Sequence, residues 1–130
     1  AYYRQEPRVT VDTSPMAYHY YRFGKCLFGT HHGDRVKPTD LESIMATDRA
    51  KDWGETEFRY WFTGHIHHET KKELRGCTVE SFRTLAAKDE WHFASGYRSK
   101  RNMVAMSYHK DTGERSRWTW AVEMDDGRIV

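Results

Sequence analysis

Residues 58–68 read FRYWFTGHIHH, and this stretch decides the fold because an aromatic run passes directly into a glycine and three histidines. Within residues 59–64 the side chains alternate as on a strand, with Tyr60 and Phe62 on the same face as Phe58 and Trp61 on the other. Since both faces carry large rings, the pattern predicts a strand that is partly covered on each side.

Strand-like runs lie on both sides of this stretch. Aromatic and apolar residues fill positions 16–32, and the Gly24-Lys25 break predicts a hairpin whose second strand ends at residues 30–32. Residues 69–75 alternate charges, and residues 77–82 read as their antiparallel partner.

A second hairpin is expected near the carboxyl end, from residues 103–109 and 116–122. The intervening Asp111-Thr112-Gly113 offers a glycine for positive φ. One face of the last strand would hold three side chains that we expect in the core or in an interface: Trp118, Trp120 and Val122.

One helix is indicated, at residues 40–53. Thr39 and Glu42 fit a capping box of the Ser/Thr-x-x-Glu type after Pro38, and Gly54 lies where a C-terminal glycine would end the helix. Four apolar residues fall near one helical face: Leu41, Ile44, Met45 and Trp53. The expected fold is therefore α+β, mostly β in a mixed or antiparallel sheet, with one main helix at about residues 40–53.

Length and composition bound the class of protein. At 130 residues the chain fits one domain or half-domain, residues 1–130. Charged residues make up 31% with both signs interspersed and the formal net charge is only +2, so charge gives no case for a nucleic-acid or membrane protein. The amino-terminal residues, without Met or a signal-peptide pattern, read as the middle of a longer chain.

Cysteine usage indicates the compartment. Cys26 and Cys77 each lie inside a strand-like run and form no CxxC pair, so we expect two free, buried thiols in a reducing cytoplasm. No apolar stretch approaches the ~18 residues that a membrane-spanning helix needs. The expected location is cytoplasmic.

Five of the eight histidines fall in two clusters, each just past an apolar strand, and these are His31-His32 and His65, His67 and His68. Ligands at strand ends have well-fixed backbones, and neutral imidazole is a common protein ligand for Zn, Mn or Fe. In extended chain, His-x-His directs both rings to one side. Two such clusters separated by one helix favour a shared metal site.

A structural interpretation is the alternative. A lone His-x-His in a β protein is more often a surface or structural pair than a pair of ligands. A closed zinc-finger site is a poor rival, because neither cluster has a thiolate nearby. Because the chain has two such clusters, a shared metal site is favoured over a structural pair and over a zinc finger.

Gly64-His65-Ile66-His67 resembles the GHxH motif that ends the ligand set of calcineurin-like metallophosphoesterases, and His32-Gly33 resembles the single-histidine motif that precedes it. Further stretches are similar to a phage- and prophage-encoded branch of this family: YYRFG at 20–24, DRA at 48–50, YWFTGHIHH at 60–68 and VESFRTL at 79–85. The resemblance covers nearly the whole chain. It implies the carboxy-terminal half of the family's αββα sandwich.

The resemblance also implies a ligand set and cofactors. His32 and His65 would bind one divalent ion (Mn, Fe or Zn), and His67 would bind the second. His31 is the alternative to His32, and His68 would at most contact a ligand. No catalytic residue beyond the metal ligands is implied.

The acidic half of the family's site is missing. The residues before His32 contain no Asp-x-His and no Asn, and the sole Asn of the chain is Asn102. Gly33-Asp34 is an alternative for the bridging Gly-Asp, but nothing between Asp34 and Gly64 can serve as the Gly-Asn-His motif that should follow. Asp34 therefore stays an alternative or outer contact only, and the chain alone, with a half-filled ligand set, is expected to bind metal weakly or not at all.

The expected function is that of the carboxy-terminal segment of a dinuclear phosphoesterase acting on phosphomonoesters or phosphodiesters, with nucleic acid as a candidate substrate. The segment would be inactive alone. Its partner would be the missing amino-terminal half or a second copy, since apolar strands such as residues 58–62 would lose their cover. The rivals are a non-catalytic β-rich binding module and one subunit of a split enzyme.

Other residues could contact a nucleic-acid substrate. A set of basic residues reads first as a solvated face and only second as phosphate contacts: Lys71, Lys72, Arg75, Arg98, Lys100 and Arg101. Trp91, followed by His92, reads as a packing aromatic before a base-stacking one.

Overall fold

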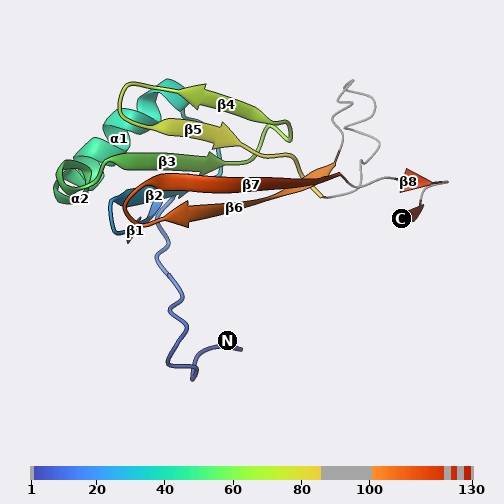
Figure 1. The fold of residues 1–130 in the computed structure, drawn as a ribbon, viewed down its shortest axis with the longest axis horizontal. Helices are drawn as coiled ribbons and strands as arrows, with labels where there is room; N and C mark the ends of the chain where they lie inside the picture. The colour runs from blue at the N-terminus through green and yellow to red at the C-terminus, as the bar shows by residue number, and fades with distance from the viewer. Residues whose placement is uncertain (1, 86–100, 122–123, 126–127, 130) are drawn as a thin grey trace.

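The centre of the protein is a five-stranded mixed sheet in the order β1-β2-β3-β5-β4 (Figure 1). The structure, a computed structural model, describes residues 2–85, 101–121, 124–125 and 128–129. The five strands are β1 (His19–Phe23), β2 (Cys26–His31), β3 (Phe58–Thr63), β4 (Thr70–Glu73) and β5 (Thr78–Ser81). The inner strands β2, β3 and β5 are parallel, and the edge strands β1 and β4 pair antiparallel with their neighbours. The carboxyl ends of three parallel strands therefore meet at one edge of the sheet.

A hairpin of β6 (Asn102–His109) and β7 (Gly113–Ala121) crosses one face of this sheet (Figure 1). The expected turn glycine, Gly113, has a φ of 79°. The Tyr108 ring packs against the rings of Phe28 and Tyr60, with centroids 4.8 and 4.9 Å away. A short pair, β8 (Met124–Asp125) and β9 (Arg128–Ile129), follows.

The helical segment differs from the expected single helix at residues 40–53. It consists of a 3-10 turn (Pro38–Asp40) and two helices, α1 (Leu41–Asp48) and α2 (Ala50–Glu55). The break is at Arg49, with φ −126° and ψ 45°, where the Arg49 side chain bonds Asp52 at 2.7 Å. After the bend, Trp53 lies under the guanidinium of Arg59, 4.1 Å from ring centroid to Cζ. A tertiary cation–π contact thus accompanies the change of direction.

The predicted caps of this helix are wrong. Thr39 lies within the 3-10 turn, and α1 has no side-chain hydrogen bond at its N-cap, so the capping box with Glu42 does not form. Gly54 lies inside α2, which ends at Glu55, and Thr56 is the extended C-cap residue. Pro38 starts a tight 3-10 turn, so the α-helix begins only after Thr39.

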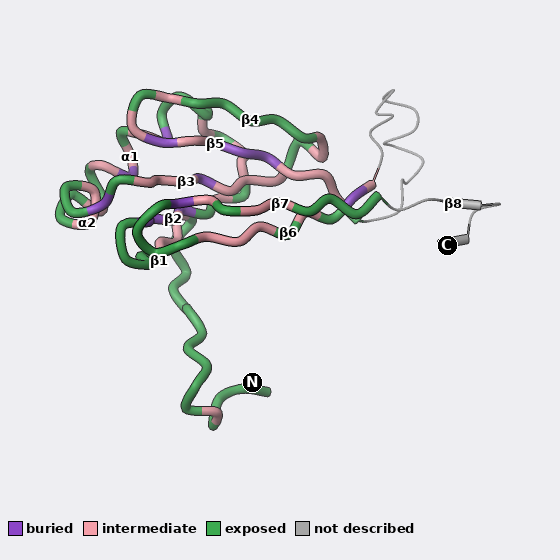
Figure 2. The backbone as a smooth tube through the Cα atoms, in the orientation of Figure 1, coloured by how far each residue is buried: buried purple, intermediate pink, exposed green. Residues whose placement is uncertain are grey.

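The strands agree with the sequence pattern to within a few residues, and both faces of β3 are covered. Buried stretches lie along β2, β3 and β5 (Figure 2). On the helix side, Trp61 is fully buried and donates its indole N–H to the carbonyl of Leu41 at 2.9 Å. The core cluster is formed by Leu27, Leu41, Met45, Trp61, Cys77 and Val79. The strand at residues 58–62, which was expected to lose its cover, is thus covered by α1 on one side and by the hairpin on the other.

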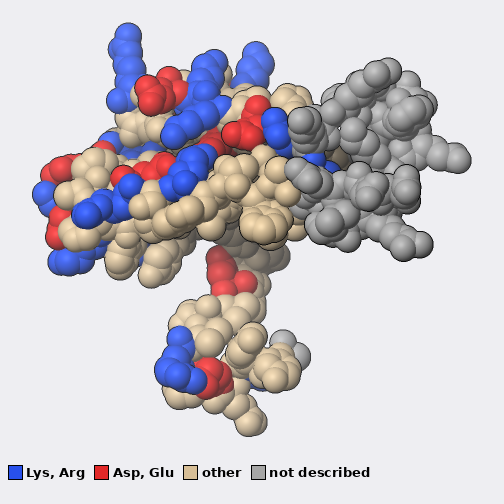
Figure 3. Space-filling model, turned by 45° about the vertical axis from the view of Figure 1, so that its right-hand side comes forward, with Lys and Arg blue, Asp and Glu red and all other residues tan. Residues whose placement is uncertain are grey.

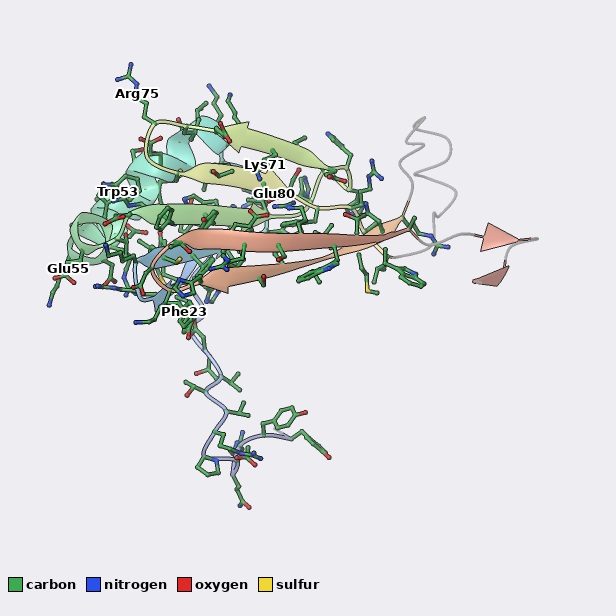
Figure 4. The ribbon with its side chains drawn as sticks, in the orientation of Figure 1. Phe23, Trp53, Glu55, Lys71, Arg75 and Glu80 are labelled. Carbon is green, nitrogen blue, oxygen red and sulfur yellow. The ribbon has the colours of Figure 1, made fainter. Side chains whose placement is uncertain are left out.

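Polar side chains attach the hairpin to the sheet (Figure 4). The carboxylate of Glu80 is 3% exposed and accepts a hydrogen bond from Arg117 Nη2 at 2.8 Å. Arg117 also bonds Glu114, which holds the pKa of the Glu114 carboxyl below its usual range. Lys71 of β4 lies 3.8 Å from Glu114. Each of these ion pairs spans or supports the junction between sheet and hairpin.

The hairpin also exposes apolar rings. Trp118 and Trp120 are 59% and 67% exposed, so of the two expected places, core or interface, the core is wrong and the interface stays a prediction. The register pairs Trp118 with Ala105 and Trp120 with Met103, and the strand alternation turns this side away from Tyr108 and the sheet. Val122, Trp91 and His92 lie outside the described residues.

The two cysteines are free and buried, as predicted. Burial raises the pKa of the Cys77 thiol to about 12. No helix within the described part of the chain is long and apolar enough to span a membrane.

Charges of both signs are interspersed over the face in Figure 3, which agrees with the small net charge. Residues 2–17 extend away from the body as an exposed arm (Figures 1 and 3). Of the predicted basic face, Lys71, Lys72, Arg75 and Arg101 are described, while Arg98 and Lys100 lie outside the described residues.

Gly29 tests the packing of the core. A Cβ at this position would lie 2.7 Å from the Trp61 ring and 2.8 Å from Met45 Cε, so Gly29→Ala should lower the free energy of unfolding by about 2 kcal/mol. Gly54→Ala is the matched control, because a Cβ at Gly54 meets nothing within 4 Å and the residue is helical. It should leave stability unchanged or raise it by about 0.5 kcal/mol. Urea unfolding measures both, and equal effects would contradict this packing.

Candidate functional site

The two histidine clusters meet at the carboxyl edge of the parallel strands. β2 and β3 are neighbours, with His31 opposite Thr63 in the register. Just beyond the strands, the Gly64 N–H donates to the His32 carbonyl at 3.0 Å. Gly33 has a φ of 101°, and a Cβ there would lie 3.0 Å from the Gly64 carbonyl oxygen. Glycine at this position therefore allows the two loops to approach each other.

The side chains of His32 and His65 are in contact. His32 Nε2 lies 3.1 Å from His65 Nδ1, the ring centroids are 5.0 Å apart, and both residues are exposed. Two imidazole nitrogens on one tetrahedral zinc ion would be about 3.3 Å apart. The same separation is a hydrogen bond when one ring donates to the other. The geometry thus suits two ligands of one ion without requiring the ion.

The backbone around this pair is strained. His65 and His67 have φ values of 64° and 56°, in the left-handed region that residues with a Cβ rarely adopt. Hydrogen bonds within the loop hold this conformation, from the Ile66 N–H to the Gly64 carbonyl at 2.7 Å and between His68 Nδ1 and the Ile66 carbonyl at 2.8 Å. Such strain concentrates at sites with a function.

The remaining candidates do not join the pair. Within the described residues, no group of three or more His, Cys, Asp or Glu side chains could hold a metal ion, so the half-buried His67 does not complete a triplet with His32 and His65. His68 contacts the Ile66 carbonyl through its Nδ1. The Asp34 carboxylate lies 3.5 Å from Arg35 Nε.

His31 has a structural role that distinguishes it from His32. Its ring stacks on Tyr18 with centroids 4.6 Å apart, and its Nδ1 accepts the Gly33 N–H at 2.9 Å. The sequence analysis missed Tyr18. The two-residue turn at Gly24-Lys25 sets the register of the hairpin, with Phe23 opposite Cys26 and His19 opposite Thr30. The same register continues to Tyr18 opposite His31, so the turn could have revealed this contact.

No protein-family model matches the chain, and no curated protein matches it. The interpretation of the histidine pair therefore depends on its own geometry and on the motif residues.

The strain at His65 can be measured by comparing glycine with alanine. Because glycine adopts a left-handed φ without a steric penalty, His65→Gly should be more stable to urea than His65→Ala by about 1 kcal/mol. His31 supplies the matched control, since it lies in β2 with ordinary strand geometry. There His31→Gly should be less stable than His31→Ala. The same order at both positions would show that the loop is not strained.

Proposed function

We propose that this chain contributes the histidine side of a divalent-metal phosphoesterase centre, as the carboxy-terminal, histidine-bearing part of a calcineurin-like metallophosphoesterase. The observation that carries the proposal is the 3.1 Å separation of His32 Nε2 and His65 Nδ1 at the ends of adjacent parallel strands. The packing of α1 against one face of the five-stranded sheet supports it, because each half of an αββα sandwich has a helical layer on one sheet. The expected substrate is a phosphomonoester or phosphodiester, with nucleic acid as one candidate.

The residues present fit one part of a dinuclear centre. His32 and His65 would hold one ion through their exposed nitrogens, and His67 would contribute to the second. A zinc ion takes about four ligands and a manganese ion about six, so other donors must complete both sites. The acidic ligands would come from a segment beyond these 130 residues or from a partner chain. Two ions held in this way supply a nucleophile at neutral pH and neutralise charge on the phosphoryl group.

The chain's own residues would orient the centre. Gly33 allows the two loops to approach each other, and the left-handed His65 fixes the direction of its imidazole before any ligand arrives. The exposure of both rings leaves the site open to substrate and to the missing ligands. Preorganisation of this kind reduces the cost of assembling the site when the acidic half docks.

A non-catalytic binding module is the second candidate. The direct contact between His32 and His65 favours it, because a ring-to-ring hydrogen bond satisfies one nitrogen of each side chain without a metal. Metal binding by the pair therefore separates the two functions.

The metal test compares neighbouring histidines. His32→Ala and His65→Ala should each weaken Zn²⁺ or Co²⁺ binding at least tenfold, because each removes one of two ligands. His31→Ala is the matched control and should leave the affinity within about twofold, since the His31 ring is stacked on Tyr18. Isothermal titration calorimetry measures the affinities. An equal loss in all three variants would contradict the assignment.

The activity test uses bis-p-nitrophenyl phosphate with excess Mn²⁺. The chain alone should show no turnover above background, because three histidines cannot hold two ions without a bridging carboxylate. Adding a segment that carries the acidic ligands should raise the rate at least about 10³-fold, and His67→Ala should abolish that gain.

Two outcomes of this assay would change the conclusion. Turnover by the chain alone, lost in His67→Ala, would show that its ligand set is already complete. No turnover after addition of the acidic segment would support the binding module instead.

A further inference from the structure

A cavity of about 410 Å³ lies beside the histidine loop on the helix face of the sheet. Its volume is in the range of small-molecule sites. Five apolar side chains from different parts of the chain line it, and they are Val36, Pro38, Leu41, Ile66 and Val79. Leu41 and Val79 belong to the rigid core, so this wall exists before any ligand binds.

The histidine loop separates the cavity from the histidine pair. Ile66 lines the cavity, whereas His65 contacts His32 and neither of these two histidines lines it. Ile66 is 37% exposed, which is unusual for an aliphatic side chain between two strained residues. The loop therefore presents an imidazole to one site and an aliphatic side chain to another.

Among the residues that the structure describes, Lys72 is the only charged one that lines the cavity. In the register Lys72 is opposite the buried Val79, which places both on the helix face. Its neighbour Lys71 lies on the other face and pairs with Glu114. No ion pair to Lys72 occurs among the described residues, and no Asp or Glu lines the cavity. The cavity thus combines an apolar wall with one uncompensated positive charge.

The hydroxyl groups of the cavity are already committed. Ser81 Oγ donates to the His68 carbonyl at 2.9 Å, so the 2.6 Å contact between Thr70 and Ser81 leaves the Thr70 hydroxyl as the donor. The third hydroxyl of the lining, that of Thr63, donates to the Glu80 carbonyl at 3.1 Å. None of the three hydroxyls has a proton left to donate to an anion. Lys72 is therefore the group that would bind a negative charge here.

We propose that this cavity binds a small anionic ligand with an aromatic or aliphatic body, a phosphate or carboxylate at Lys72 and the apolar body against Val36, Pro38 and Ile66, over a floor of buried Leu41 and Val79. The site needs neither a metal nor the acidic half of the phosphoesterase. Its existence is therefore independent of the proposed function.

Binding of 1-naphthyl phosphate to the full 130-residue chain, measured by calorimetry in the presence of EDTA, tests the proposal. The chain should bind one equivalent, and Lys72→Ala should weaken binding about tenfold through loss of a charged hydrogen bond. Lys71→Ala is the matched control on the opposite face of the same strand and should leave the affinity unchanged. Neutral 1-naphthol should bind at least about tenfold more weakly than the phosphate.

Two further variants locate the ligand. Ile66→Trp should fill the cavity and abolish binding, while its far-UV circular dichroism and melting temperature stay those of the parent. His65→Ala should retain binding, which distinguishes this site from the proposed metal centre. Equal losses in Lys71→Ala and Lys72→Ala, or unchanged binding in Ile66→Trp, would overturn the proposal and place the ligand elsewhere, for instance on the exposed Trp118 and Trp120.

Discussion

The rest of the structure depends on the packing of Trp61. Its side chain is fully buried, its indole N–H bonds the Leu41 carbonyl, and Gly29 of the adjacent strand leaves the space that the ring occupies. Tyr20 of β1 meets the same ring edge-on, with centroids 5.5 Å apart. One side chain thus fixes how β1, β2, β3 and α1 lie relative to one another. Because a large ring fits only one arrangement of these neighbours, it also fixes where β2 and β3 end.

The histidine pair is a consequence of that arrangement. Since β2 and β3 are parallel and in register, the residues that follow them emerge at the same height of the sheet. The Gly64 N–H then bonds the His32 carbonyl, and His65 reaches His32. On the opposite face, the hairpin contributes Tyr108 and Arg117, which cover the aromatic side of β3 without contacting the pair. The framework is therefore rigid where the histidines begin, and strain is confined to the loop itself.

Two kinds of chemistry share this edge of the sheet. The exposed imidazoles suit a divalent ion, while the cavity behind the loop suits an apolar body with a negative charge. The histidine pair and the cavity both depend on the conformation of residues 64–68, because His65 contacts His32 while the next residue, Ile66, lines the cavity. A ligand in the cavity would contact the same loop that orients His65. Binding at one site can thus change the other through that loop or through Gly33, which lines the cavity next to His32.

The sequence by itself determined the strands, the two hairpins, the free cysteines and the position of both histidine clusters, because each depends on local alternation or on a turn glycine. It also held enough to separate His31 from His32, since the hairpin register places Tyr18 opposite His31. Only the tertiary structure decided the break at Arg49, where Arg22 of β1 bonds Asp52 and Arg59 of β3 stacks on Trp53. The missing capping box follows from the turn at Pro38–Asp40. The tertiary structure also decided that Lys72 borders a cavity, because a strand's periodicity specifies which residues share a face but not what packs against that face.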